Sequence, residues 1–399
     1  MSVPRLVDIF LRRRLDVANT TPVAPGGKTI ERKKMMIRRR SSVAFAALAM
    51  SAGLLIAGCT PAAEEAAEEP ADTGSEETTE ESSAGGPDFS SVQVALVPGG
   101  AHPYFQPWIA GGEAAVAEFG IGTTEFNETG EWDQTKHNAA IDSMAAQGYN
   151  AFGIFGVSPT DINTTFTNLK DQGFATGSLA SCPAGDVNEA DFCLSTDTGE
   201  AAYLATVALI EQMGGEGAVV HLTGNAVDSN TVRRIDGVQK AIDETGGAVT
   251  LLTTITDIDT DLQSAQKAVT DLLAAQGDQV NGIVTTAYNP AVAATEGVGD
   301  TGLPIEVIAI DDDAIILDAI RDGTISGTVV QNPWGQGYVG SYVLAALQTG
   351  YCEMNEPGLY VDSGSFLVTQ DNVETYDAER EATSKEILAA FQNEYMTCN

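Results

Sequence analysis

Short apolar runs alternate with longer amphipathic segments from residue 92 to residue 395. The stretch 307–337 shows this pattern most clearly. An apolar run over 307–310 precedes an acidic turn, a helix over 314–321 that Asp322-Gly323 ends, and a second run over 326–331. A run without polar positions is typical of a strand buried on both faces. Asn332-Pro333 then predicts a new helix, because the first turn does not use the N–H that proline lacks.

The same alternation predicts the remaining elements. The predicted strands cover 92–97, 121–126, 151–157, 174–179, 218–222, 249–255, 282–286, 307–310, 326–331, 359–362 and 365–368. The predicted helices cover 109–119, 133–147, 158–172, 199–213, 231–244, 261–275, 290–297, 314–321, 337–348 and 379–395. Strands that alternate with helices predict parallel sheets, and about ten strands favour two α/β lobes over one sheet. Asp311 and Gln331 follow predicted strands, and ligands of open α/β sheets bind outside such strand ends.

Residues 1–58 are predicted to be a targeting segment and not part of the fold. A charged region at Arg38–Arg40 precedes an apolar region over 43–57, and Ile56-Ala57-Gly58-Cys59 resembles the bacterial lipobox, whose cysteine takes lipid. A cleaved signal peptide with an incidental cysteine is the alternative. Because a permanent span needs about 20 apolar residues, we expect a lipid anchor on Cys59. Met35 and Met36 are alternative starts.

Residues 59–88 are predicted to form a disordered acidic tether. The segment is rich in Glu, Ala, Ser, Thr and Pro, so it cannot bury a core, and its like charges extend it. We therefore expect a globular body held off the outer face of the cell membrane.

The charge of the chain excludes some partners. The formal net charge is −36, and nine Lys and Arg residues follow Cys59. Nucleic acid binding needs a basic surface, so we expect no nucleic acid partner and a solvated acidic surface. The sequence has no P-loop, no dinucleotide fingerprint, no Gly-x-Ser-x-Gly and no HExxH. We therefore predict no enzymatic activity and no cofactor.

Four cysteines remain after Cys59. An exported chain meets oxidising conditions, so we expect two disulfides. We favour Cys182–Cys193 and Cys352–Cys398 because the first pair is local, and the other connectivities stay open. A metal site is not expected, because no CxxC is present and the chain has only three histidines.

Five segments, taken in order, resemble the substrate-binding proteins of bacterial sugar ABC importers, in particular the ribose-binding-like branch with its type I periplasmic fold. The segments are Ala-His-Pro-Tyr-Phe at 101–105, Trp-Asp-Gln at 132–134 with Ser158-Pro159 after it, Arg-Ile-Asp-Gly at 234–237, Asn-Pro-Ala at 289–291, and Asp311 with Gln-Asn-Pro at 331–333. The chain departs from the family pattern at Ala180-Ser181, where an acid is usual, and at His102, Tyr288 and Asn289. The ligand is therefore not expected to be held as ribose is.

The resemblance implies two doubly wound parallel-sheet lobes joined by a three-strand hinge. The N-terminal lobe would contain 89–195 and 332–362, and the C-terminal lobe 196–331 and 363–399. It also implies a monomer that captures a sugar or sugar-like polyol in the cleft, closes about the hinge, and delivers the ligand to the permease of an ABC importer.

Sugars present apolar ring faces and a rim of hydroxyls, so their sites combine aromatic planes with polar groups of fixed geometry. Tyr104 and Phe105 are candidates for stacking, and Trp132 and Trp334 are candidates if they do not serve in core packing. Polar candidates are the acceptor Asp311, the planar donor Arg234 with Arg233 as its alternative, the amides of Asn289 and Gln331, and His102, which could instead cap a helix.

Three alternatives stay open. A lipoprotein of the same fold could present the ligand to a membrane receptor instead of an importer. The ligand could be a nucleoside or another non-sugar solute. An exported hydrolase is a third alternative, although no nucleophile–base pair is visible in the sequence.

Overall fold

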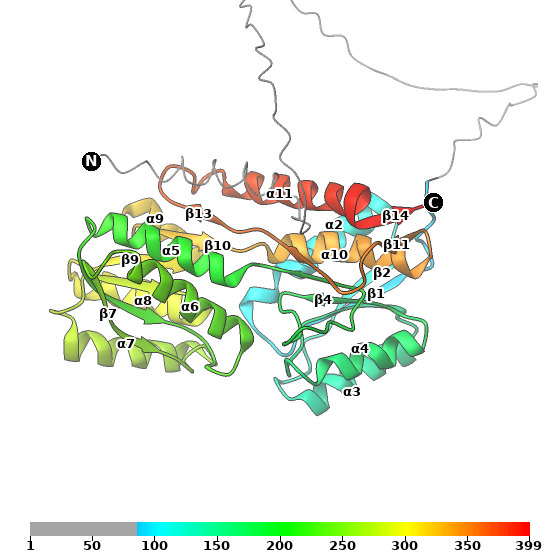
Figure 1. The fold of residues 1–399 in the computed structure, drawn as a ribbon, viewed down its shortest axis with the longest axis horizontal. Coiled ribbons are helices and arrows are strands. Elements are labelled where there is room, and N and C mark those ends of the chain that lie inside the picture. Colours follow the sequence, from blue (N-terminus) through cyan, green and yellow to red (C-terminus); the bar gives the residue numbers. More distant parts are fainter. Residues whose placement is uncertain (1–85) are drawn as a thin grey trace, which may run out of the picture. The chain divides into compact units, whose positions relative to one another are not determined.

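A computed structural model describes residues 86–399, which form one compact unit with two α/β lobes (Figure 1). The predicted signal segment, Cys59 and the tether up to residue 85 lie outside the described residues. Each lobe contains one six-stranded, mainly parallel sheet with helices on both faces, which confirms the predicted fold class.

The sheet of the first lobe is parallel throughout. Its strands, in spatial order, are β12 (Leu359–Asp362), β5 (Phe192–Ser195), β4 (Ala175–Leu179), β3 (Ala151–Ile154), β1 (Gln93–Val97) and β2 (Thr123–Phe126). The 3₁₀ turn η1 (Pro103–Phe105) and helix α2 (Pro107–Phe119) follow β1. Helices α2 and α10 (Pro333–Gln348) pack on one face, and α3 (Gln134–Ala146) and α4 (Ile162–Asp171) on the other.

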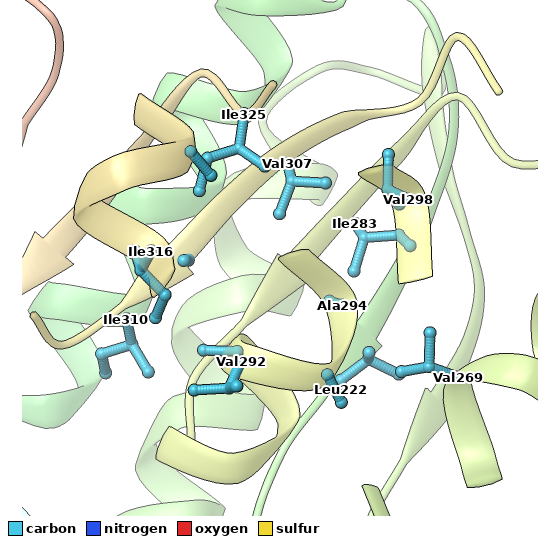
Figure 2. Close-up of a cluster of buried hydrophobic side chains, with 14 of the residues drawn as sticks. Leu222, Val269, Ile283, Val292, Ala294, Val298, Val307, Ile310, Ile316 and Ile325 are labelled. Atoms are coloured by element: carbon cyan, nitrogen blue, oxygen red, sulfur yellow. The ribbon is translucent and has the colours of Figure 1, made fainter. Parts of the chain in front are cut away.

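The sheet of the second lobe is parallel except at its edge. Its strands, in spatial order, are β13 (Phe366–Val368), β10 (Gly327–Val330), β9 (Glu306–Ile310), β8 (Gly282–Thr285), β6 (Gly217–Leu222) and β7 (Val249–Ile255), with β13 antiparallel to β10. The helices are α5 (Thr198–Gln212), α6 (Ser229–Asp243), α7 (Leu262–Gln276), α8 (Tyr288–Thr301) and α9 (Ala314–Asp322). Side chains of α7, α8 and α9 meet the strands in an apolar core that includes Val269, Val292 and Ile316 (Figure 2).

Aspartates start several of these helices. The side chains of Asp133, Asp197, Asp228, Asp261 and Asp313 each accept a hydrogen bond from a backbone N–H in the first turn of α3, α5, α6, α7 and α9. Such a cap satisfies a donor that the helix itself leaves free, and a carboxylate also complements the positive end of the helix dipole. Part of the acidity of the chain is therefore used in building the fold.

One helix pair in each lobe packs through glycine. A Cβ added to Gly111 of α2 would lie 2.2 Å from the carbonyl oxygen of Trp334 in α10, and one added to Gly237 of α6 would lie 2.2 Å from the carbonyl oxygen of Gly199 in α5. Real side chains do not approach so closely, so only glycine permits these helix crossings.

The chain crosses between the lobes at three places in the described region. The first crossing is Thr196–Asp197 between β5 and α5, the second is Gln331–Asn332 between β10 and α10, and the third is 363–365 between β12 and β13. Two hydrogen bonds join the first and third crossings side by side, from Ser363 N to Ser195 O (3.1 Å) and from Asp197 N to Asp362 Oδ1 (2.9 Å).

The end of the chain returns to the first lobe, although the second lobe was expected to hold 363–399. Helix α11 (Tyr376–Ala390) begins beside the second lobe, with Tyr376 in its core, and runs across to the first (Figure 1). A π-helical turn (Phe391–Tyr395) follows, and strand β14 (Met396–Cys398) pairs with β11 (Cys352–Met354). Phe391 and Met396 lie in the core of the first lobe because this two-stranded ribbon anchors the end of the chain there.

Both favoured disulfides are present, Cys182–Cys193 between the loop after β4 and strand β5, and Cys352–Cys398 across the β11–β14 ribbon. Three strands, β5, β11 and β14, were not expected from the sequence pattern.

Within residues 86–399, the structure contains no helix that is both long and apolar enough to cross a membrane.

Candidate functional site

A cavity of about 260 Å³ lies between the lobes at the carboxyl ends of their strands. The first lobe contributes Pro103, Tyr104 and Pro333 to its walls, and the second contributes Tyr288, Asp311 and Asp312. This is the position in which parallel α/β sheets bind ligands, and it includes two of the residues predicted from the sequence, Tyr104 and Asp311.

Asp311 directly follows β9 and is almost completely buried. Its φ of 67° lies in the left-handed region, which aspartate tolerates better than most residues. The backbone is held by hydrogen bonds from Asp311 N to Val329 O (2.9 Å) and from Thr328 Oγ1 to Asp311 O (2.8 Å). Gln331, also predicted as a site residue, donates from Nε2 to Asp311 Oδ1 (2.8 Å). These contacts fix the direction of the Asp311 carboxyl group.

Burial raises the pKa of Asp311 from its ordinary 3.8 to about 7. The hydrogen bond from Gln331 acts in the opposite direction, the negative charges of Asp312 and Asp259 raise the pKa further, and the positive charge of Arg234 lowers it. The loss of hydration therefore raises the pKa of Asp311 by more than the Gln331 hydrogen bond and the Arg234 charge lower it.

Arg234 lies in the first half of α6, near the cavity. Its charge acts on Tyr104, Asp311 and His221, and its Nε is buried without a hydrogen-bond partner. A guanidinium group is planar and always charged, with five N–H donors. A buried donor of this kind without a partner is a group that a ligand can satisfy.

Tyr104 and Phe105 form the aromatic wall of the first lobe. Their ring centroids lie 5.0 Å apart in an edge-to-face arrangement. The Phe105 ring is buried against Trp108 and Phe155, so it supports the wall, whereas Tyr104 lines the cavity. Burial raises the pKa of Tyr104 above its ordinary value of 10.0, so its hydroxyl group stays neutral.

His102 serves as a helix cap, one of the two roles considered for it. Its Nδ1 accepts a hydrogen bond from Tyr104 N (3.2 Å) at the start of η1. Its Nε2 faces the second lobe, 3.6 Å from Asp259 Oδ2, and its ring contacts Tyr288 edge to face, with centroids 5.7 Å apart. His102 therefore joins the lobes at one side of the cavity.

Asp259 is a site neighbour that sequence reasoning missed. It accepts a hydrogen bond from Asn289 N at Oδ1 (2.8 Å), and its carbonyl oxygen accepts one from Asn289 Nδ2 (2.8 Å). The predicted site residue Asn289 thus uses its amide N–H groups within the protein. Asp259 lies in an Asp-rich turn before α7, where the sequence signal for a helix cap hides any other role.

The two tryptophan candidates have different surroundings. Trp132 has a φ of 56° and an exposed fraction of 44%, and its ring packs near His102 and Phe105 with centroids 6.2 and 6.1 Å away. It lies beside the residues that form the wall. Trp334 instead stacks on Tyr338 within α10, with centroids 4.8 Å apart and an interplanar angle of 20°, and does not line the cavity.

A second missed residue is Gln336 in α10, which is fully buried. Its side chain contacts the hydroxyl group of Tyr104 and the ring nitrogen of Trp108. In the sequence it is one polar position in a helix of small and apolar residues, and Tyr104 and Trp108 lie more than two hundred residues away from it. No local pattern could have identified it.

His221, the histidine of the second lobe, does not line the cavity. His221 on β6 is fully buried, and Nε2 shares a hydrogen bond of 2.8 Å with Thr286 Oγ1. Burial, with Arg234 as a second cause, lowers the pKa of His221 to about 3, so the ring is neutral at physiological pH. The described residues contain no group of three or more His, Cys, Asp or Glu arranged to hold a metal ion.

Several further polar atoms at the start of α6 are buried without partners. They are Ser229 Oγ, Asn230 Oδ1 and Thr231 Oγ1. Asn230 Nδ2 donates to Ala180 O of the first lobe (3.2 Å), so this end of α6 faces the other lobe. Ala180 stands where an acid was expected from the family pattern, and its carbonyl oxygen takes part in this interlobe contact. These unpartnered atoms at the start of α6 belong to the second lobe, whereas Tyr104 and Phe105 belong to the first.

Comparison with known proteins identifies both family and fold. A family model described as a periplasmic binding protein domain matches residues 94–351. A sugar-binding protein of a sugar ABC transporter from Bacillus halodurans superposes with a TM-score of 0.64 at 23% identity, over 71% of this chain and 99% of that one. A solute-binding protein from Burkholderia graminis, solved with D-arabinose, gives 0.64 at 21% identity, over 73% and 99%.

An arabinose-binding protein from Geobacillus stearothermophilus gives a TM-score of 0.62 at 22% identity, over 72% of this chain and 99% of that one. These likenesses extend over nearly the whole of each solved chain and establish the shared fold. No curated protein sequence matches the chain.

Proposed function

We propose that this chain, which belongs to the periplasmic binding protein domain family, captures a sugar or a sugar-like polyol between its two lobes and delivers it to the permease of an ABC importer. We further propose that lipid on Cys59 anchors it outside the cytoplasm and that the acidic segment after Cys59 is the tether.

One observation supports the ligand assignment, namely that Tyr104 and Asp311 line one cavity and that the positive charge of Arg234 acts on both. Electrostatic interactions couple the three residues. An aromatic face suits the apolar side of a sugar ring. The unpartnered Arg234 donor and the Asp311 acceptor suit neighbouring hydroxyl groups, because each hydroxyl both accepts and donates.

The charges around the cavity favour a neutral ligand. The charges of Asp259 and Asp312 both act on Asp311, and Asp312 already bonds to Arg380 on α11 (2.8 Å). An anionic ligand would meet these carboxylates, and a cationic ligand would meet the positive charge of Arg234. A polyhydroxylated neutral molecule satisfies the donor and the acceptor without adding charge.

The sugars in the solved neighbours provide a first panel. D-arabinose, D-fucose, D-allose and D-tagatose occur in the described complexes, and polyols and nucleosides extend the panel. A ligand present at 100 times its Kd should stabilise the folded state by about 2.7 kcal/mol. A thermal-shift screen detects this as a rise in Tm. No response to any sugar or polyol would contradict the proposal.

Two neighbouring arginines give a matched pair of variants. Arg234→Gln should weaken binding of any hit about 10- to 100-fold, because the ligand loses a charged hydrogen-bond donor. Arg233→Gln removes the same charge one position away, from a side chain that lines a different cavity, and should leave the affinity unchanged. Isothermal titration calorimetry measures both. Equal losses would show that net charge, not contact with Arg234, governs binding.

The anchor has its own measurement. Cells that express the chain with radioactive palmitate should label the wild type and not Cys59→Ser, which removes the thiol that lipid requires. Labelling of the variant, or none of the wild type, would refute the lipid anchor and leave the proposed binding activity untouched.

A further inference from the structure

A ring of buried polar side chains lies directly behind the aromatic wall. Gln336 Nε2 lies 3.1 Å from Tyr104 Oη and 3.1 Å from Ser363 Oγ. Gln336 Oε1 accepts a hydrogen bond from Trp108 Nε1 (3.1 Å). Ser363 Oγ shares a hydrogen bond of 3.1 Å with Thr196 Oγ1. Tyr104, Gln336, Ser363 and Thr196 therefore form one hydrogen-bonded network around the hinge, which we call the hinge ring.

The hinge ring reaches all three crossings between the lobes. Thr196 belongs to the first crossing and Ser363 to the third. Asn332 of the second crossing donates from Nδ2 to Ser363 O (2.9 Å) and to Ser384 Oγ of α11 (3.0 Å). A ligand contact, the three crossings and the bridging helix α11 thus share one hydrogen-bonded network.

Burial makes this network restrictive. Thr196, Gln336, Ser363, Asn332 and Ser384 are all at most 1% exposed. A buried polar group that loses its partner costs far more than an average hydrogen bond gains, so these side chains can change only together. Opening and closing of such lobes takes place as backbone rotation at the crossings. Rotation there must therefore preserve or exchange the bonds of the hinge ring.

Tyr104 has two roles in this arrangement. It lines the cavity, and its hydroxyl group is bonded to Gln336, which holds a side chain of the third crossing. Gln336 does not line this cavity, but it is the link through which displacement of Tyr104 reaches the hinge. An amide suits this place because it both accepts from Trp108 and donates to two hydroxyl groups.

We infer that Gln336 is a positioning residue that couples the cleft residue Tyr104 to the three hinge crossings, so that occupancy of the cleft biases the opening of the lobes. The statement that a ligand in the cleft causes this bias rests on the proposed function. The coupling itself is a property of the empty protein and can be measured without any ligand.

Hydrogen exchange at the crossings tests this coupling. Two reporters are the backbone N–H groups of Asp197 and Ser363, whose acceptors are the last residues of β12 and β5, the strands that lead into the two crossings. The full chain is compared with Tyr104→Phe, which removes one oxygen atom, and with Gln336→Met, which keeps the length of the side chain. Both variants should accelerate exchange at the reporters about five- to tenfold, the effect of losing one buried hydrogen bond.

A control variant and an internal reference separate coupling from general destabilisation. Gln348→Met changes the same helix and also removes a hydrogen-bonded amide. The partners of Gln348 are Ala175 N and Gly173 O, which lie far from the crossings, so this variant should leave the reporters unchanged. The N–H of Phe152 in the central strand β3 reports global unfolding. If Gln336→Met does not fold, Thr196→Val replaces it and removes one hydroxyl group of the same ring.

The double variant decides whether the residues act as one unit. If they do, Tyr104→Phe combined with Gln336→Met accelerates the reporters no more than the stronger single variant. Unchanged reporters in Tyr104→Phe, acceleration that merely follows Phe152, or independent effects that multiply in the double variant would each overturn the inference. Failure of every sugar to bind would refute the proposed function and leave these exchange rates as they are.

Discussion

Asp311→Asn removes the one carboxyl group in the cavity whose ionisation opposes folding. The raised pKa means that the folded protein holds the Asp311 proton more tightly than the unfolded chain does. The contribution of this group to stability is therefore fully present below pH 4 and is lost as the pH rises through about 7. Asparagine carries no charge at any pH and can still accept the hydrogen bond of Gln331, so the variant should not show this loss.

The magnitude follows from the pKa difference. A rise from 3.8 to about 7, at about 1.4 kcal/mol per pH unit, corresponds to about 4 kcal/mol as an upper limit. Relaxation of the cavity and entry of water reduce this value, so we expect about 2–4 kcal/mol. We therefore compare the free energy of unfolding of the variant minus that of the wild type at the two ends of this range. This difference should be larger at pH 8 than at pH 4 by about 2–4 kcal/mol.

Urea unfolding at pH 4, 5, 6, 7 and 8, followed by far-ultraviolet circular dichroism, measures this difference. Tryptophan fluorescence is unsuitable, because Trp108, Trp132 and Trp334 all belong to the first lobe and Asp311 to the second. The matched control is Asp142→Asn, which makes the same substitution on the exposed face of α3, away from the cavity. Parallel pH profiles of wild type and Asp311→Asn would refute the reasoning, since the carboxyl group would then titrate alike in both states.

Two further predictions concern the packing around the hinge. Arg380→Ala should lower the free energy of unfolding by about 1–2 kcal/mol, because it removes the cationic partner of Asp312 at 2.8 Å and leaves only the hydrogen bond from Tyr376 between Asp312 and α11. Urea unfolding measures the loss, and a value within error of wild type would show that α11 is held by other contacts. Gly111→Ala should destabilise by about 1–3 kcal/mol, because its Cβ would lie 2.2 Å from Trp334 O. The control is Gly299→Ala in α8, where the added Cβ would lie 3.4 Å from its nearest neighbour, Thr324 Cγ2. Equal Tm values for the two variants would contradict the close packing of α2 and α10.

The sequence predicts most of the fold because strand and helix periods differ and the chain separates its elements clearly. β9, α9 and β10 lie within one or two residues of their predicted ranges. β5 was missed because its four residues follow a long cysteine-containing loop and are too short to show a period. β11 and β14 were missed because each exists only through the other, across the 46 residues that separate Cys352 from Cys398.

The site was less predictable than the fold. Asp311 and Tyr104 could be found because each follows a strand, where local order alone indicates the ligand side of a sheet. Gln336 could not, because its importance comes from partners in three distant segments. Trp334 shows the converse limit, since an aromatic residue after a strand end can equally stack on its own helix, as it does on Tyr338. Local patterns identify which end of a strand is used, and only the folded chain determines which side chains meet there.

The strand order also limits when this protein can finish folding. β12 completes the edge of the first sheet and β13 that of the second, and both are made near the end of the chain, after nearly everything they pair with. A chain emerging from the ribosome therefore holds two unfinished sheets until residue 368, and the first lobe lacks its closing ribbon until Cys398. Premature termination anywhere before these strands damages both lobes at once, so partial chains of this protein cannot retain one intact half.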